Sequence, residues 1–330
     1  MTKKAHDYSM LGTTVKKFIQ SLEGGKPIYT LTPQEARNVL INVQKNTPVT
    51  LLPADIEEKT IPVGPKGSVK IRIVRPQNNK QNLPIIIYMH GGGWILGNVD
   101  THDRLVREIA HGAQAAVVFV EYTLAPEGQY PTAHEEGYAV VEWIAKNGAA
   151  LQMDTTRMAI AGDSVGGLMA TAIALMCAER KGPQFMMQLL LYPVTDANFE
   201  TKSYQEFATG YFLERAGMQW FWDAYVPDKS MRKNPLVTPL NASLDQLKQL
   251  PPALITVHEC DVLRDEGEAY AHKLIAAGVP VIGCRYLGVT HDSCMLNPLA
   301  DAPTVRAMIA QSIDTLKAVF ENKNSPFKKA

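Results

Sequence analysis

The segment Met158-Ala-Ile-Ala-Gly-Asp-Ser-Val-Gly-Gly167 joins an apolar run to a stretch of strong helix formers. Arg157 to Ala161 is short and largely apolar, whereas Leu168 to Glu179 is rich in alanine, leucine and methionine, so the pattern predicts a strand, a sharp turn and a helix. Ser164 lies in the turn, with a glycine two residues away on either side. Such a G-x-S-x-G turn lets strand and helix approach closely and holds a serine in a strained conformation, with its hydroxyl exposed at the sheet edge. The turn indicates a nucleophilic serine if the chain also supplies a base, an acid and oxyanion donors; otherwise it is a tight structural connection.

The rest of the chain predicts a mostly parallel, doubly wound α/β sheet. Leu83 to Met89 and Ala115 to Glu121 are nearly continuous apolar runs, which is typical of strands covered by helices on both faces. Ser68 to Arg75 alternates apolar and polar residues, so we expect the sheet to begin there. The remaining elements alternate, with strands expected at 187–191, 253–258 and 281–287 and helices at 105–111, 132–147, 165–180, 266–277 and 304–321.

Two segments stand outside this alternation. Residues 1 to about 55 are polar and contain two helix-like stretches, Thr14 to Leu22 and Thr32 to Gln44, the second opened by a capping box with proline at the first helical position. Residues 56–330 are expected to form the core domain, with an aromatic insertion at about 196–247 that has no strand pattern. Because ligands bind beyond the carboxyl ends of parallel strands, we expect the insertion to form a helical cap over an apolar pocket. More than half of its aromatic residues are expected to fill the insertion's own small core.

The composition favours a small-molecule partner. The 330 residues carry 33 basic and 33 acidic side chains, so no electrostatic footprint for nucleic acid or an anionic membrane is expected. The first residues lack the apolar run of a signal peptide and no later stretch is long enough to span a membrane, which predicts a cytoplasmic protein. The four cysteines are irregularly spaced, so we expect reduced thiols and no zinc site. The oligomeric state stays open, with a homo-oligomer among the alternatives, because no heptad pattern stands out.

Three successive glycines follow the strand that ends at Met89, in the segment His90-Gly-Gly-Gly-Trp94. Their unshielded N–H groups can hold an oxyanion, with Gly92 and Gly93 as the best candidates. Hydrolases that use such a serine add the N–H of the following residue, here Val165. A phosphate-binding loop is the alternative, but no G-K-[ST] or G-x-G-x-x-G pattern accompanies the glycines. We expect His90 to fasten the loop by hydrogen bonds.

His291 is the candidate for the general base, since it lies in a loop after the last expected strand, with Gly288 giving the turn. The acid should follow an earlier strand end, and Ala253 to Asp261 ends a strand with a carboxylate. The order Ser164, Asp261, His291 is the serine, acid, histidine order of hydrolases with this turn.

Three other carboxylates compete with Asp261 for the role of acid. Glu259 lies close to the strand itself, and Asp265 can serve the N-terminus of the next helix. Asp292 adjoins the histidine and would have to fold back to orient it. We favour Asp261 over these.

Four motifs in order carry a family resemblance: His90 to Gly97 matches H-G-G-G-W-x-x-G, Tyr122 to Glu127 matches Y-R-L-A-P-E, Gly162 to Gly167 matches G-D-S-A-G-G, and Asp261 to Gly267 matches D-P-L-R-D-E-G. From about residue 55 to its end, the chain resembles the bacterial hormone-sensitive-lipase-like esterases, which are α/β-hydrolases with an H-G-G-G motif. The resemblance implies an α/β-hydrolase fold, and a cap built from the N-terminal segment plus the insertion. It also implies a catalytic triad of Ser164, Asp261 and His291. The implied oxyanion hole is formed by the N–H groups of Gly92, Gly93 and Val165.

Four positions depart from the family pattern. Thr123 replaces arginine, Val165 replaces alanine, Val262 replaces proline, and Asp292-Ser-Cys294 stands where glycine and phenylalanine are usual. None of these changes replaces a residue of the implied triad. Val165 and the segment after His291 are expected to alter the shape of the pocket, and we interpret Cys294 as a buried bystander.

We therefore expect a serine carboxylesterase that acts on small to medium acyl esters without a metal or cofactor. One alternative is a non-catalytic small-molecule receptor, because gibberellin receptors resemble this family and lack the catalytic histidine; His291 argues against it. The other is an amidase, whose leaving group His291 would have to protonate more effectively.

Overall fold

An eight-stranded sheet organises the fold, with the strand order β1-β2-β4-β3-β5-β6-β7-β8. The computed structural model of the chain describes residues 7–322 and 325–327. Strands β3 to β8 run parallel, whereas β2 pairs antiparallel with both β1 and β4. The strands are β1 (Ala54–Ile61), β2 (Val69–Pro76), β3 (Leu83–Met89), β4 (Ala116–Glu121), β5 (Met153–Asp163), β6 (Gln188–Leu191), β7 (Ala253–Cys260) and β8 (Val281–Thr290).

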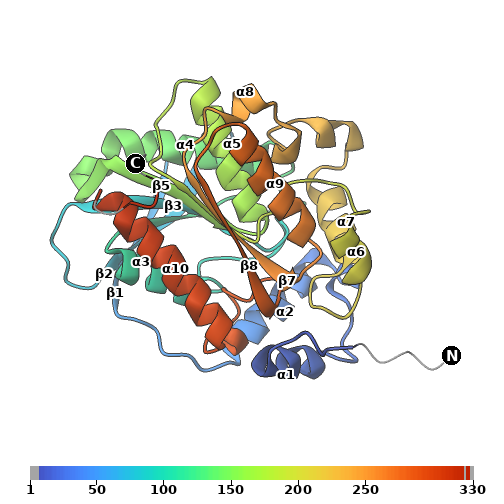
Figure 1. The fold of residues 1–330 in the computed structure, drawn as a ribbon. Coiled ribbons are helices and arrows are strands. Elements are labelled where there is room, and N and C mark those ends of the chain that lie inside the picture. The colour runs from blue at the N-terminus through green and yellow to red at the C-terminus, as the bar shows by residue number, and fades with distance from the viewer. Residues whose placement is uncertain (1–6, 323–324, 328–330) are drawn as a thin grey trace.

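Helices cover both faces of this sheet, so the predicted doubly wound α/β architecture is confirmed. Helices α3 and α10 pack together on one face, and α4, α5 and α9 cover the other (Figure 1). The helices are α1 (Thr13–Ser21), α2 (Pro33–Lys45), α3 (Asp103–Ala113), α4 (Thr132–Asn147), α5 (Val165–Glu179), α6 (Lys202–Glu206), α7 (Arg215–Tyr225), α8 (Leu244–Leu247), α9 (Arg264–Ala276) and α10 (Pro303–Phe320). Within residues 7–322 and 325–327, no helix is both long and apolar enough to cross a lipid bilayer.

The sheet begins earlier than the sequence pattern predicted, at β1 rather than at the strand near residue 68. Strand β1 has the sequence Ala-Asp-Ile-Glu-Glu-Lys-Thr-Ile and lies at the sheet edge, largely exposed. It pairs with β2 along its whole length, and ion pairs join Arg72 to Glu58 and Arg75 to Glu57 across the two strands. Because backbone pairing and opposite charges stabilise β1 rather than burial, it lacks the apolar alternation by which strands are found.

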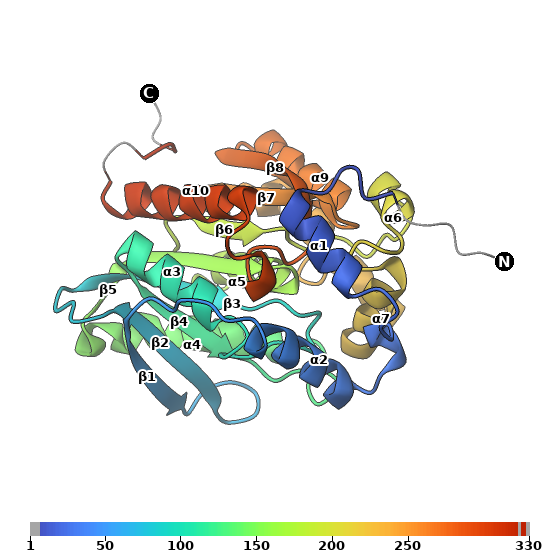
Figure 2. The same cartoon turned by 90° about the horizontal axis from the view of Figure 1, so that it is seen from below.

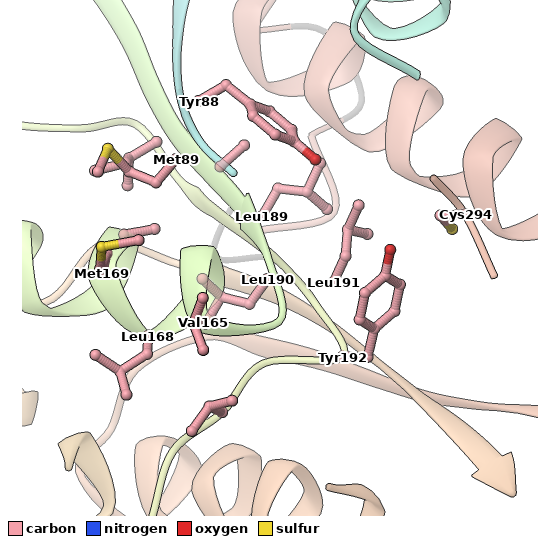
Figure 3. Packing of buried hydrophobic residues seen from close by; sticks show 14 of the residues in the cluster. Tyr88, Met89, Val165, Leu168, Met169, Leu189, Leu190, Leu191, Tyr192 and Cys294 are labelled. Atoms are coloured by element: carbon pink, nitrogen blue, oxygen red, sulfur yellow. The ribbon is translucent and has the colours of Figure 1, made fainter. Parts of the chain in front are cut away.

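Helix α5 forms the centre of the core. Its residues from Val165 to Cys177 are all buried, between the sheet and α4. Figure 3 shows Val165, Leu168 and Met169 of this helix beside Met89 of β3 and residues 189–191 of β6. A helix that is apolar on every side is buried on every side. Ser164, which directly precedes α5, is therefore held by a helix packed within the core.

The N-terminal helices and the first two helices of the insertion gather at one end of the sheet. Helices α1, α2, α6 and α7 lie together there in both views (Figures 1 and 2). The capping box of α2 is confirmed, since the Thr32 side chain accepts from the Glu35 N–H and Glu35 accepts from the Thr32 N–H. In the insertion, the expected helical character is confirmed as α6, α7, α8 and short 3₁₀ turns. Six of its aromatic side chains are buried, namely Tyr204, Phe207, Tyr211, Phe221, Trp222 and Tyr225.

Candidate active site

Ser164 occupies the turn between β5 and α5. Its backbone has φ 54° and ψ −123°, a region that non-glycine residues rarely adopt, and the side chain is only 3% exposed. A Cβ on Gly162 would overlap the backbone of Gly166, and one on Gly166 would overlap the carbonyl oxygen of Met89. The glycines therefore permit the close approach of strand and helix that holds the serine in this conformation.

The structure brings Ser164, His291 and Asp261 into one hydrogen-bonded chain. His291 Nε2 lies 2.8 Å from Ser164 Oγ, and His291 Nδ1 lies 2.7 Å from Asp261 Oδ2. Asp261 follows β7 directly and His291 follows β8 directly, so both residues stand at the carboxyl edge of the sheet. An ionised carboxylate only accepts hydrogen bonds, so Nδ1 carries the hydrogen toward Asp261, and neutral His291 leaves its Nε2 lone pair for the serine hydroxyl. All three side chains are buried.

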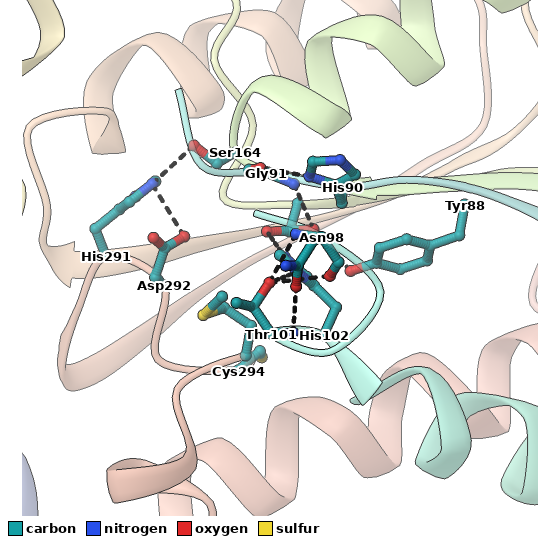
Figure 4. Close-up of polar contacts among 12 residues, drawn as sticks. Tyr88, His90, Gly91, Asn98, Thr101, His102, Ser164, His291, Asp292 and Cys294 are labelled. Carbon is teal, nitrogen blue, oxygen red and sulfur yellow. Dashed lines mark hydrogen bonds and ion pairs between the residues drawn. The ribbon is translucent and has the colours of Figure 1, made fainter. Parts of the chain in front are cut away.

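The competing carboxylates have other partners. Glu259 accepts the N–H of Gly288 at 2.8 Å, and Asp265 accepts the N–H of Ser203 at 2.8 Å. Asp292 does approach the histidine, but at the opposite nitrogen, with its Oδ1 3.4 Å from Nε2 (Figure 4). Of the four candidates, Asp261 is thus the carboxylate that reaches Nδ1.

Gly92 and Gly93 form a tight turn next to the serine. Their φ values are +97° and +62°, and the Gly92 carbonyl accepts the N–H groups of Ile95 and Leu96 at 3.2 and 2.8 Å. A Cβ on Gly93 would overlap the ring of Phe221, which comes from the insertion. Within the described part of the chain, neither glycine N–H donates a hydrogen bond. Val165 is the first residue of α5, a position whose N–H has no partner within the helix, so all three predicted donors can serve a ligand.

His90 fastens the glycine loop, as expected. Its ring stacks on Tyr122 and Phe119, with centroids 4.2 and 5.1 Å away, and its carbonyl accepts the Tyr122 hydroxyl at 2.8 Å. Burial lowers the pKa of His90 to about 3, and nearby His102 acts in the same direction. A histidine that stays neutral and packed in this way is suited to hold the loop rather than to transfer protons.

Sequence reasoning assigned no role to Asp163, which precedes the serine. Its Oδ1 accepts the Tyr88 hydroxyl at 2.8 Å and the Gly91 N–H at 3.0 Å, and its Oδ2 lies 3.3 Å from His102 Nε2. Burial raises the pKa of Asp163, but His102 and the Tyr88 hydrogen bond outweigh this effect and hold the pKa below its usual value. This buried carboxylate joins the serine turn to the loop of Gly92 and Gly93. Its place inside the G-D-S motif was the available signal, whereas nothing in the sequence singled out His102.

The electrostatics of His291 are dominated by carboxylates. Burial lowers the pKa of His291, but the charges of Asp261, Asp292 and Asp163 and the hydrogen bond with Asp261 outweigh it and raise the pKa to about 9. Burial raises the pKa of Asp292 to about 6, against the opposing charge of His291. Burial also raises the pKa of the Cys294 thiol, which supports its interpretation as an inert bystander.

The N-terminal segment is tied to the loops that carry these residues. Arg37 of α2 donates to the carbonyls of Ile95 and Ala125 and forms a bidentate pair with Glu127. The buried Gln44 amide donates to the Thr101 and Met295 carbonyls at 2.5 and 2.8 Å. The helix α2 therefore links the loop after β3 to the loop after His291. Across residues 7–322 and 325–327, no group of three histidine, cysteine or acidic side chains is placed to hold a metal ion.

Comparisons with known proteins agree with this geometry. A family model described as the α/β hydrolase fold matches residues 86–295. The solved structure of a thermostable esterase from Pseudomonas putida is 46% identical, with a TM-score of 0.93 over 96% of this chain and 99% of that chain. A carboxylesterase of Mycobacterium tuberculosis is 41% identical over 240 residues, 72% of this chain and 75% of that protein. An ethyl acetate hydrolase of Pseudomonas putida is 33% identical over 295 residues, 86% of this chain and 91% of that protein. The chain therefore belongs to the α/β-hydrolase fold family, within which the relatives it resembles are esterases, as its motifs predicted.

Proposed function

We propose that this protein is a serine carboxylesterase that hydrolyses small to medium acyl esters through an acyl-enzyme intermediate. The observation that carries the proposal is the continuous chain from Asp261 through His291 to Ser164, with contacts of 2.7 and 2.8 Å. A nucleophile and base within hydrogen-bonding distance, and a third group that orients the base, are the general requirements of nucleophilic catalysis. The relatives named as esterases and carboxylesterases support the same activity.

In the first half of the reaction, neutral His291 accepts the Ser164 proton at Nε2 while Oγ attacks the ester carbonyl carbon. The carbonyl oxygen becomes an oxyanion, for which the N–H groups of Gly92, Gly93 and Val165 are the candidate donors. Each such donor contributes about 3 kcal/mol to stabilisation of the transition state. His291 then delivers its proton to the departing alcohol, which leaves the acyl group on Ser164. Asp261 keeps the histidine in the required tautomer and stabilises its imidazolium form.

In the second half, a water molecule takes the place of the alcohol. His291 accepts a proton from this water as it attacks the acyl carbonyl carbon, and the same three N–H groups are offered to the second oxyanion. Collapse of this intermediate returns the proton to Ser164 Oγ and releases the carboxylic acid. Every step uses the same nitrogen, Nε2, so the protonation state of His291 controls both halves.

The restriction to small and medium acyl groups rests on the large side chains around the site. We propose that residues 1–55 and the insertion at about 196–247 act together as a cap. Phe221 of α7 packs directly on Gly93, and Trp94 stacks on Tyr225 with a centroid distance of 4.7 Å. Ser164 is almost fully covered in this arrangement. A relative named ethyl acetate hydrolase supports a preference for short acyl chains.

The proposal is tested by comparing wild type with Ser164→Ala in hydrolysis of p-nitrophenyl esters of increasing acyl length and in labelling by a fluorophosphonate. Wild type should hydrolyse the acetate and butyrate faster than the laurate and should be labelled once, whereas Ser164→Ala should do neither. The control is Ser312→Ala, which removes another buried hydroxyl; among the described residues, this hydroxyl donates to the Met308 carbonyl within α10. This variant should behave as wild type.

Three outcomes would contradict the proposal. Ester hydrolysis by Ser164→Ala at the wild-type rate would exclude Ser164 as the nucleophile. A wild-type protein that neither hydrolyses esters nor reacts with the fluorophosphonate would point to a receptor. Hydrolysis of an anilide faster than the matched ester would instead indicate an amidase.

A further inference from the structure

Asp292 is an additional carboxylate at the base. Its Oδ1 lies 3.4 Å from His291 Nε2, the same nitrogen that lies 2.8 Å from Ser164 Oγ, while Asp261 occupies Nδ1. The residue has φ +60°, the left-handed conformation that carries its side chain back toward the preceding histidine. Figure 4 shows the Asp292 carboxylate turned toward the His291 ring. Asp292 is 9% exposed, and its buried Oδ1 has no hydrogen-bond partner within residues 7–322 and 325–327.

Two carboxylates on one imidazole constrain its protonation. A neutral histidine carries one hydrogen, and the contact with Asp261 places it on Nδ1. The Nε2 lone pair then faces an ionised Asp292 oxygen, which is electrostatically unfavourable. If the imidazole is protonated on both nitrogens, each carboxylate faces an N–H and opposite charges lie in contact. Protonated His291 cannot accept the Ser164 proton. Asp292 therefore stabilises the form of His291 that cannot act as the general base.

Among the other groups around this pair, His102 opposes the negative charge of Asp292, whereas Asp163 and Asp261 add to it. The groups that face this pair are Tyr88 of β3, Asp163 of β5, His102 just before α3, Tyr192 after β6, His258 of β7, Asp261 just after β7, and Cys294 of the same loop as Asp292. Arg104 of α3 is engaged elsewhere, with Glu108, Asn297 and the Cys294 carbonyl. Among the described residues, no lysine or arginine pairs with Asp292. Tyrosines and the buried thiol stay neutral, so the site holds three carboxylates against the imidazoles.

We propose that Asp292 holds His291 in its protonated form at neutral pH, so that it restrains the base and makes activity rise as the solution becomes alkaline. This inference rests on the proposed serine esterase function. The directions of the two pKa shifts agree with it, because between about pH 6 and pH 9 both Asp292 and His291 are charged. With the pKa of His291 raised to about 9, the neutral form that can act as a base is the minority form at pH 7.

The test is the pH dependence of kcat/KM, which reports the pKa of the base in the free enzyme. Wild type is compared with Asp292→Asn, which removes the charge but keeps the size and tolerates a positive φ, and with Asp292→Gly, which suits the backbone still better. An opposite charge in contact shifts a pKa by about 1 to 3 units. We therefore expect the acid limb of the profile to move down by about one unit or more in both variants, and kcat/KM at pH 7 to rise about tenfold.

The control is Asp301→Asn, which removes one negative charge from an exposed position beyond the same loop. Its profile should coincide with that of wild type. The inference is overturned if the acid limb of Asp292→Asn and Asp292→Gly stays where it is in wild type, or if both variants lose activity at every pH, since Asp292 would then support the base rather than restrain it.

A second measurement separates this inference from the proposed function. The His291 ring is followed by NMR through its Cε1–Hε1 resonance, assigned by comparison with His291→Asn, in protein carrying Ser164→Ala so that turnover plays no part. The resonance should titrate near pH 9 with Asp292 present and at a lower pH in the Asp292→Asn background. Equal titration in both backgrounds overturns the role of Asp292. Persistent hydrolysis by Ser164→Ala would overturn the esterase mechanism, without changing how His291 titrates.

Discussion

Replacement of Asp163 tests the link between the serine turn and the glycine loop. In Asp163→Ala, three buried donors lose their acceptor: the Tyr88 hydroxyl, the Gly91 N–H and the His102 Nε2–H, which now contact the carboxylate at 2.8, 3.0 and 3.3 Å. Each buried donor left unpaired costs about 1–3 kcal/mol, and loss of the buried charge offsets part of the sum. We expect a net destabilisation of about 4 kcal/mol. For a chain of 330 residues, that lowers Tm by about 6 °C.

Asp163→Asn separates the hydrogen bonds from the charge. The amide oxygen can still accept from Tyr88 and Gly91, so only the contact with His102 is lost, at a cost of about 1–2 kcal/mol. Because Gly91 leads directly into Gly92, a small displacement of the loop should still lower kcat about tenfold.

Differential scanning fluorimetry gives Tm, and p-nitrophenyl butyrate hydrolysis gives kcat. The control is Asp154→Ala, at the start of the same strand. Its carboxylate accepts hydrogen bonds from Thr156 and Arg157, and its removal should change Tm by less than about 2 °C. A Tm for Asp163→Ala within that same margin of wild type would refute the reasoning.

The remaining predictions concern the proposed machinery itself. Asp261→Asn should leave Tm nearly unchanged and lower kcat on the order of 10⁴-fold, because His291 loses the acceptor that sets its tautomer; a loss below tenfold in steady-state assays would contradict this. Gly93→Ala should lower kcat at least about 100-fold, because its φ of +62° and the Phe221 ring leave no room for a methyl group; adding Phe221→Ala should restore part of the activity, and no rescue would show that the ring is not the obstacle. Val165→Ala should raise the ratio of hexanoate to acetate hydrolysis about tenfold while Ser164 labelling by a fluorophosphonate changes less; an unchanged ester profile would count against a role for Val165 in selectivity.

The local sequence pattern was sufficient to predict many of the strands and helices. The strand Leu83–Met89 and the helix Thr132–Asn147 have the bounds that their apolar patterns predicted, because burial on both faces and helical propensity act over a few neighbouring residues. The edge strand Ala54–Ile61 was missed because cross-strand charges replace burial there. The network around Asp163 was also missed. It depends on contacts with Tyr88 and His102, which are 75 and 61 residues away in sequence, and no local rule reports them.

The sequence by itself determined the class of fold, the position of the serine turn and the set of residues from which a relay could be built, because each is encoded in short motifs with defined backbone requirements. Only the tertiary structure decided how the carboxylates are distributed around His291. Asp261 reaches Nδ1, and Asp292 turns back to Nε2. The reason is geometric: which oxygen meets which nitrogen depends on where β7 and β8 end in the sheet and on the positive φ of Asp292. The local pattern of residues specifies neither of these.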